Sequence, residues 1–202
     1  MQLIDNRKMQ KEINKLFPVF LKLEQMQVLL VGAGNVGLEK LTALLTNSPA
    51  TKIHVVAIEV TPAFEELAQK FKNVEITKAA YEPSHLENIQ LAITALNDAE
   101  LSYEIVQQAR ARNILINAAD KPELCDFYLG GVVTKGNLKI AISTNGKSPT
   151  MAKRLKEFFN DALPDTIDDL LINLNVFRKK LTGTFQEKVN RLNELTKTLG
   201  ED

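Results

Sequence analysis

The stretch VLLVGAGNVG, residues 28–37, decides how this chain is expected to fold. Its first half is an apolar run typical of a buried strand, and its second half carries Gly32, Gly34 and Gly37. Leucines at helical spacing continue beyond Gly37, so the apolar period changes from that of a strand to that of a helix. The stretch therefore predicts a strand, a tight glycine turn and a helix.

The three glycines have the spacing G-x-G-x-x-G, which suits a pyrophosphate group. Gly32 permits the tight turn, Gly34 keeps side-chain atoms away from the phosphates, and Gly37 lets the helix lie close to the strand. The first turn of the helix adds free N–H groups and a positive dipole end. A strand–helix turn that binds no nucleotide is the alternative interpretation of the same motif.

A second apolar run, residues 53–58, ends in Glu59, which lies 22 residues after Gly37. This interval is close to the ~20 residues expected for the acid that binds the adenosine ribose hydroxyls. No arginine stands beside Glu59 to receive a 2′-phosphate. The sequence therefore favours NAD over NADP.

Further strands are expected at 73–77, 91–95 and 114–116, with helices between them, and this alternation predicts a Rossmann-like parallel sheet of the α/β class. A proline-interrupted apolar run at 16–21 is read as a short edge strand. Asn97 is read as the cap of the helix that follows the fourth strand. Glu59, Asn97 and Asp120 all fall at the carboxyl edge of the predicted sheet, where ligands of such sheets bind.

The pattern changes after this sheet. Two short strands at 129–133 and 138–142 are joined by a turn and are expected to be antiparallel. Ser148 then caps a helix, and the chain from Thr166 onward reads as helical. We expect a Rossmann domain over 1–117, a small antiparallel region over 118–147 and a helical domain over 148–202.

Composition excludes several classes of protein. The chain holds 25 basic and 25 acidic residues among 202, so no basic field indicates nucleic-acid binding. Its apolar runs are too short to span a bilayer, and its first residues are not those of a secretory signal. The single cysteine, Cys125, excludes an internal disulfide framework and favours a reducing cytoplasm. The two histidines have no neighbouring acidic or cysteine cluster, so we expect no metal site.

Two features remain as candidates for chemistry. Asp120 stands where nucleotide and substrate should meet, and its carboxylate is placed to accept a proton or to cap the turn before Pro122. The polar loop 144–148 offers backbone amides and Lys147 to carboxylates or phosphates, or it serves only as the lead-in to a helix.

Two longer motifs carry a family resemblance. The sequences NAADKPELCDF at 117–127 and IAISTNGKSP at 140–149, with FPVF at 17–20, resemble precorrin-2 dehydrogenase, the dehydrogenase and ferrochelatase module of siroheme synthase. The resemblance covers residues 16 to about 160 clearly and the helical tail loosely. Glycines at 130–131 and Lys135 depart from residues that are frequent in relatives.

The resemblance implies a reaction and a set of site residues. NAD⁺ takes a hydride from precorrin-2 to give sirohydrochlorin, and some members also insert Fe²⁺ to give siroheme. Asp120 matches the family's key aspartate, a general base. The expected cofactor-binding residues are Gly32, Ala33, Gly34, Asn35, Val36, Gly37, Ile58, Glu59 and Asn97. The expected substrate-binding residues are Asn117, Thr144, Asn145, Gly146, Lys147 and Ser148.

The family also implies a homodimer, with residues 118–147 as its dimerisation region. Two other functions stay open on the sequence alone: a non-catalytic NAD-binding regulatory protein, and a chelatase without dehydrogenase activity. Asp120 and the loop 144–148 argue against the first of these, because a sensor needs only the glycine turn. The glycine turn with Glu59 argues against the second.

Overall fold

The computed structural model describes residues 13–197. The chain divides into two compact units, one up to Leu129 and one from Gly130, and each is described by itself. The expected boundaries at 117 and 147 do not coincide with this division, and the three-part organisation stays a prediction.

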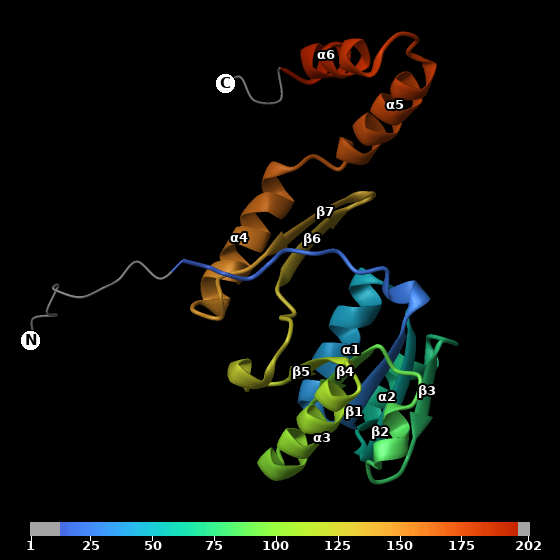
Figure 1. Ribbon diagram of the computed structural model, residues 1–202, viewed down its shortest axis with the longest axis vertical. Coiled ribbons are helices and arrows are strands. Elements are labelled where there is room, and N and C mark those ends of the chain that lie inside the picture. The colour runs from blue at the N-terminus through green and yellow to red at the C-terminus, as the bar shows by residue number, and fades with distance from the viewer. Residues whose placement is uncertain (1–12, 198–202) are drawn as a thin grey trace, which may run out of the picture. The chain divides into compact units, whose positions relative to one another are not determined.

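The first unit is built on a parallel sheet of five strands (Figure 1). The strands run in the order β3-β2-β1-β4-β5, with every neighbouring pair parallel. Their bounds are β1 Gln27–Ala33, β2 Lys52–Val60, β3 Val74–Thr77, β4 Leu91–Thr94 and β5 Leu115–Ala118. The order reverses beside β1, so the fold is the Rossmann-like α/β sheet that the sequence predicts.

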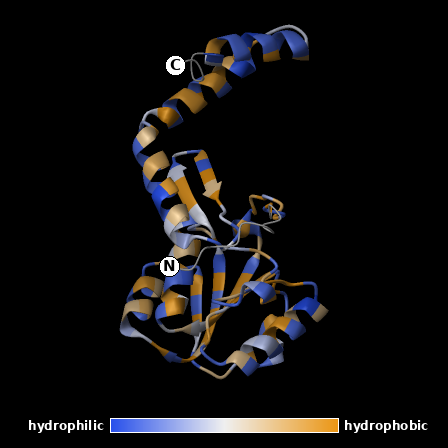
Figure 2. Ribbon diagram, turned by 90° about the vertical axis from the view of Figure 1, so that its left-hand side faces the viewer, coloured by the Kyte–Doolittle hydropathy of each residue, from blue (hydrophilic) through white to orange (hydrophobic). Residues whose placement is uncertain are grey.

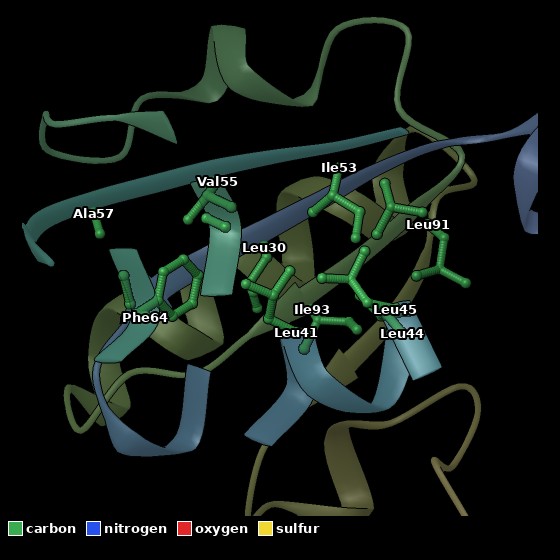
Figure 3. Close-up of a cluster of buried hydrophobic side chains, with 13 residues drawn as sticks. Leu30, Leu41, Leu44, Leu45, Ile53, Val55, Ala57, Phe64, Leu91 and Ile93 are labelled. Atoms are coloured by element: carbon green, nitrogen blue, oxygen red, sulfur yellow. The ribbon is translucent and has the colours of Figure 1, made fainter. Parts of the chain in front are cut away.

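Helices cover both faces of this sheet, which is why its strands are apolar almost throughout. On one face Leu30, Ile53 and Val55 pack with side chains of α1 (Asn35–Asn47) and α2 (Pro62–Gln69), including Leu41 and Phe64 (Figure 3). The opposite face forms a second cluster with α3 (Ala99–Ala111); its buried members include Leu29, Val31, Val56, Ile105 and Ile116. Burying each such side chain contributes about 1.5–3 kcal/mol to stability. The two clusters of buried side chains, one on each face, fix the positions of the carboxyl ends of the strands.

The second unit begins with an antiparallel pair, β6 (Gly131–Lys135) and β7 (Leu138–Ile142), as expected. Three helices follow: α4 Pro149–Ala162, α5 Ile167–Lys180 and α6 Phe185–Thr196. The predicted cap at Ser148 is confirmed, because its hydroxyl accepts from the Met151 amide. Thr184, three residues before Glu187 in the spacing of a capping box, begins α6 and forms that box with it. Short 3-10 turns lie at Leu23–Gln25, Pro83–Leu86 and Pro122–Leu124 in the first unit.

The second unit buries little apolar surface of its own. Val133 and Ile142 are its buried hydrophobic residues within the described range, and its three helices bury none. Hydrophobic residues nevertheless recur along these helices (Figure 2). Large exposed ones include Met151, Phe158, Ile172, Val176 and Phe185.

Two predicted elements are wrong in detail. Residues 13–22 form no strand, and the edge strands of the sheet are β3 and β5. Pro18 has no N–H to donate to a ladder, which disfavours pairing of this segment. The cap of α3 is Asp98, whose carboxylate accepts from the Leu101 amide at 3.0 Å, and not Asn97. No helix within residues 13–197 is long and apolar enough to cross a membrane.

Candidate functional site

The glycine turn joins β1 to α1 and depends on three different properties of glycine. Gly32 has a φ of 105°, and a Cβ there would lie 2.5 Å from the carbonyl oxygen of Ala95. A Cβ on Gly37 would collide with the carbonyl oxygen of Gly32, so this glycine sets how closely α1 approaches β1. A Cβ on Gly34 would meet nothing within 4 Å. Gly34 therefore borders open space, as a phosphate-binding position must.

Helix α1 begins directly after Gly34, and no side chain caps its first turn. The first amides of a helix have no intrahelical partner, and here the Leu38 amide is the first to bond back, to the Gly34 carbonyl at 2.8 Å. The amides of the first turn stay available to an anion, which the helix dipole also attracts.

The end of β2 is irregular next to this turn. Val31 pairs with Val56, but two residues later Ala33 pairs with Val60, so β2 carries two extra residues there. Such bulges turn side chains out of the regular alternation. Ile58 and Glu59 are both exposed at this point, and Ile58 is 74% exposed although it is a large apolar residue. The irregular pairing thus leaves the apolar Ile58 and the acidic Glu59 exposed side by side at the end of β2.

A cleft of about 540 Å³ brings these parts together. It is lined by most of the predicted cofactor-binding residues, namely Gly32, Ala33, Gly34, Asn35, Val36, Ile58, Glu59 and Asn97. Ala57, Ala95 and Leu96 also line it and escaped the sequence analysis. The position of residues 95–96 in the sequence could have indicated this, since they follow β4 directly and so fall at the ligand-binding edge of the sheet. Gly37 is buried and serves packing instead of lining the cleft.

Asn97 borders the cleft and does not cap α3. Because Asp98 caps α3, the Asn97 side chain is not used as a cap, and it lies exposed in the cleft lining. An amide side chain here offers both a donor and an acceptor to a ligand.

Asp120 lies outside this lining, at the same edge of the sheet. It follows β5, which is separated from β1 by β4. The residue is exposed and has a φ of 61°, a left-handed conformation that aspartate adopts more readily than most residues. Its carboxylate makes no hydrogen bond or ion pair with any residue between 13 and 197. A free carboxylate on a fixed turn is chemically suited to accept a proton.

The Asp120 turn is tied back to β5 through Cys125. Its sulfur accepts from the Ala118 amide at 3.3 Å and donates to the carbonyls of Ala118 and Lys121 at 3.2 and 3.3 Å. Desolvation by burial raises the pKa of the Cys125 thiol, so the neutral donor form is favoured. This structural role of Cys125 is not predicted from the sequence.

Asn117, a predicted substrate-binding residue, takes part in the same closure. It is buried, and its amide nitrogen donates to the Phe127 carbonyl at 2.8 Å and to the Cys125 sulfur at 3.4 Å. Asp126 completes the closure, because its carboxylate accepts from the Ile116 amide and binds the Arg110 guanidinium at 2.9 Å. The contacts of the Asn117 amide nitrogen are thus structural.

The loop 143–148 belongs to the second unit. The Thr144 hydroxyl accepts from the Ser148 amide and donates to the Ser148 carbonyl, which closes the loop onto itself. Asn145 and Gly146 have φ values of 55° and 72°, and a Cβ on Gly146 would meet nothing within 4 Å. The loop is a fixed turn whose exposed members include Gly146 and Lys147.

The two departures from the family have structural roles in this unit. A Cβ on Gly130 would lie 2.5 Å from the carbonyl oxygen of Ile142. Lys135 binds the Asp165 carboxylate at 2.5 Å, and this hydrogen bond lowers the pKa of Asp165.

Both histidines lie together in the first unit. The rings of His54 and His85 have centroids 5.8 Å apart, and His54 Nε2 is 2.9 Å from the Thr77 hydroxyl. Desolvation and the neighbouring His85 lower the pKa of His54, while Glu75 opposes the shift. Tyr81, beside His85, donates to Gln108, and burial raises its pKa to about 12. The described residues hold no cluster of three or more metal-ligating side chains.

Comparison with known proteins assigns this fold. Residues 19–131 match the protein family described as "Putative NAD(P)-binding". The chain belongs to this NAD(P)-binding family. Residues 135–161 match a second family, described as the sirohaem biosynthesis protein central region. The cleft fits the cofactor of the first family, because Gly34 borders open space there and the first residues of α1 and the exposed Glu59 of β2 both line it.

Similar proteins support the resemblance drawn from the motifs. The chain is 30% identical over 174 residues to the siroheme synthase of Nitrosomonas europaea, which covers 86% of this chain and 36% of that protein. It is 33% identical over 173 residues to the siroheme synthase of Psychrobacter arcticus, covering 86% and 30%. The chain thus spans about a third of the length of these relatives. The structure of SirC, precorrin-2 dehydrogenase, has the same fold, with a TM-score of 0.72, 24% identity and 89% of each chain covered.

Proposed function

We propose that the protein binds NAD⁺ in the cleft at the glycine turn and oxidises precorrin-2 to sirohydrochlorin. The observation that carries the proposal is the cleft itself, in which the turn, the first amides of α1 and Glu59 meet. The names of the relatives, siroheme synthase and precorrin-2 dehydrogenase, supply the substrate. Gly34 and the first amides of α1 would hold the pyrophosphate of a dinucleotide in this cleft, and Glu59 would hold its adenosine ribose.

Glu59 selects between the two nicotinamide cofactors. Its carboxylate accepts hydrogen bonds from ribose hydroxyls and repels the 2′-phosphate of NADP⁺. No arginine adjoins it in the sequence. Ile58, exposed beside it, gives the adenine an apolar surface.

The reaction needs a hydride acceptor and a proton acceptor. NAD⁺ supplies the first when bound, and Asp120 is the candidate for the second. The backbone of the turn that carries Asp120 is fixed by the Cys125 thiol and by the buried Asn117, and the Asp120 carboxylate has no protein partner among the described residues. A positioned, unpaired base lowers the entropic part of the barrier.

Tetrapyrrole substrates of this pathway carry several carboxylates, which need donors on the protein. Lys147, Ser148 and the backbone of Asn145 and Gly146 in the loop 143–148 are the donors we propose. The match of residues 135–161 to the sirohaem central region supports a role for this loop in the same pathway.

Insertion of Fe²⁺ into sirohydrochlorin is a second candidate activity, with Asp120 as the base that removes the pyrrole protons. It is favoured by the siroheme synthase relatives, whose name covers the whole synthesis. Fe²⁺ is then a substrate and not a resident cofactor. The alternatives of a regulatory NAD-binding protein and of a chelatase without dehydrogenase activity predict no NADH from precorrin-2.

The protein is proposed to act as a homodimer in the cytoplasm. The second unit supports a dimer, because its helices bury no residue and present large apolar side chains. A free cysteine suits a reducing compartment.

The proposal is tested by mixing the protein with precorrin-2 and NAD⁺ and following NADH absorbance. Formation of NADH together with the sirohydrochlorin spectrum is the expected result. Adding Fe²⁺ afterwards, under anaerobic conditions, tests chelation through the appearance of the siroheme spectrum above the rate without protein. Absence of NADH with intact NAD⁺ binding would contradict the dehydrogenase and favour a regulatory role.

A further inference from the structure

The carbonyl of Ala33, inside the glycine turn, receives two hydrogen bonds from one residue. Both the amide and the hydroxyl of Thr61 donate to it, each at 3.2 Å. Ala33 lines the cleft, and Thr61 lies two residues beyond Glu59. A single residue thus connects the two parts of the proposed dinucleotide site.

The hydroxyl of Thr61 does not cap the helix that Thr61 begins. Thr61 is the N-cap residue of α2, with Pro62 directly after it, and threonine in this place ordinarily accepts a bond from an amide of the first turn. Thr61 makes no side-chain cap bond to α2. Its hydroxyl bonds the glycine turn instead, which indicates a role outside the helix.

The sheet ladder is interrupted next to the glycine turn. Regular pairing of β1 with β2 stops at Val31 and Val56, and resumes only where Ala33 faces Val60. Ile58 and Glu59 lie within the interruption, so their distance from the turn is not set by regular ladder bonds. Thr61 comes directly after this interruption, and its amide and hydroxyl both donate to the Ala33 carbonyl and so attach the end of β2 to the glycine turn.

We infer that the Thr61 hydroxyl is a positioning group for the dinucleotide, fixing Glu59 at the distance from the glycine turn that spans ribose to pyrophosphate. Thr61 does not line the cleft, so it acts through Glu59 and the turn. The inference rests on the proposed binding of NAD⁺, and it adds a residue that selects the whole dinucleotide over its separate halves.

The test compares two substitutions at one position. Thr61→Val removes the hydroxyl at nearly constant volume and keeps the amide bond, whereas Thr61→Ser keeps both donors. Thr42→Val is the matched control, because the Thr42 hydroxyl also donates to a backbone carbonyl, that of Leu38 at 2.7 Å, away from the cleft lining. Binding of NADH is followed by its fluorescence, and folding by circular dichroism and thermal denaturation.

We expect Thr61→Val to weaken NADH binding about tenfold, as for a lost hydrogen bond that preorganises a site, and Thr61→Ser and Thr42→Val to stay within about twofold. In a Glu59→Gln background, Thr61→Val should weaken NADH binding by less than about twofold, because Thr61 acts on NADH through Glu59. A generally weakened fold would give equal losses in both backgrounds.

Unchanged binding by Thr61→Val, or the same loss with and without Glu59, would overturn the inference. Should Thr61→Val fail to fold, Thr61→Ala removes the same hydroxyl and enters the same comparison. Failure of the wild-type protein to bind NADH would overturn the proposed function and this inference together, and is distinguished by the absence of any binding signal.

Discussion

At the scale of single residues, Asp120 and Glu59 share one edge of the sheet but have different surroundings. Glu59 lines the cleft, whereas Asp120 stands beyond β4 on a turn with a left-handed backbone. Asp120→Asn keeps the shape and the turn preference of the residue and removes the base. NADH formation from precorrin-2 should fall by a factor of about 10²–10⁴, while NADH binding stays within about twofold. Turnover at the wild-type rate would contradict the role of Asp120 as base.

Cofactor choice is also expected to depend on a single side chain. The wild-type protein should bind NAD⁺ more tightly than NADP⁺ by at least about tenfold, because the Glu59 carboxylate repels a 2′-phosphate. Glu59→Gln should weaken NAD⁺ binding and narrow this preference. Competition titrations against NADH measure both effects. Equal affinities for the two cofactors in the wild-type protein would show that Glu59 does not meet the ribose.

His54 links stability to pH. Its pKa is lowered by burial and by His85, so the unfolded chain binds a proton more readily than the folded one. The stability due to neutral His54 is complete above the unfolded pKa of about 6.5 and is lost as pH falls below it. His54→Gln keeps a partner for Thr77 and should flatten the fall in unfolding free energy between about pH 7.5 and 5.5. Urea denaturation at several pH values measures this slope. An unchanged slope would show that other groups carry the dependence.

At the scale of elements, the strand–turn–helix unit separates packing from binding. Gly37→Ala places a methyl group against the Gly32 carbonyl and forces α1 away from β1. A loss of about 1–3 kcal/mol in unfolding free energy is expected from such overpacking. Gly34→Ala meets open space at a φ of −82°, so it should change stability by less than about 1 kcal/mol and weaken cofactor binding instead.

Denaturant titration and NADH fluorescence distinguish the two glycine variants. The opposite pattern, with Gly34→Ala unstable and Gly37→Ala neutral, would contradict this division of roles between Gly34 and Gly37.

At the scale of the whole molecule, the two units differ in how they hold together. The first has buried clusters on both faces of its sheet, whereas the second buries Val133 and Ile142 and leaves Phe158 and Phe185 exposed among its described residues. Such apolar faces favour association with a second copy. Light scattering should therefore give twice the chain mass of 22.6 kDa at micromolar concentration. The unfolding temperature should then rise with protein concentration. A monomer whose unfolding is independent of concentration would contradict the dimer.

The sequence by itself determined the features that depend on neighbours along the chain. The order of strands and helices, the glycine turn, the caps at Ser148 and Thr184 and the acid at Glu59 all follow from local period, spacing and backbone preference. Most predicted cofactor residues line one cleft because parallel strands bring their carboxyl ends to one edge.

Only the tertiary structure decided which partner each polar group takes. The Thr61 hydroxyl bonds Ala33 and not its own helix, Asp98 caps α3 so that Asn97 lies in the cleft, and the buried Asn117 amide closes a loop. The irregular pairing of β2 with β1 and the absence of a strand at 16–21 also depend on the tertiary structure. Hydrogen bonds and strand pairing join residues that are far apart in the sequence. The pattern of neighbouring residues therefore does not specify which distant groups come into contact.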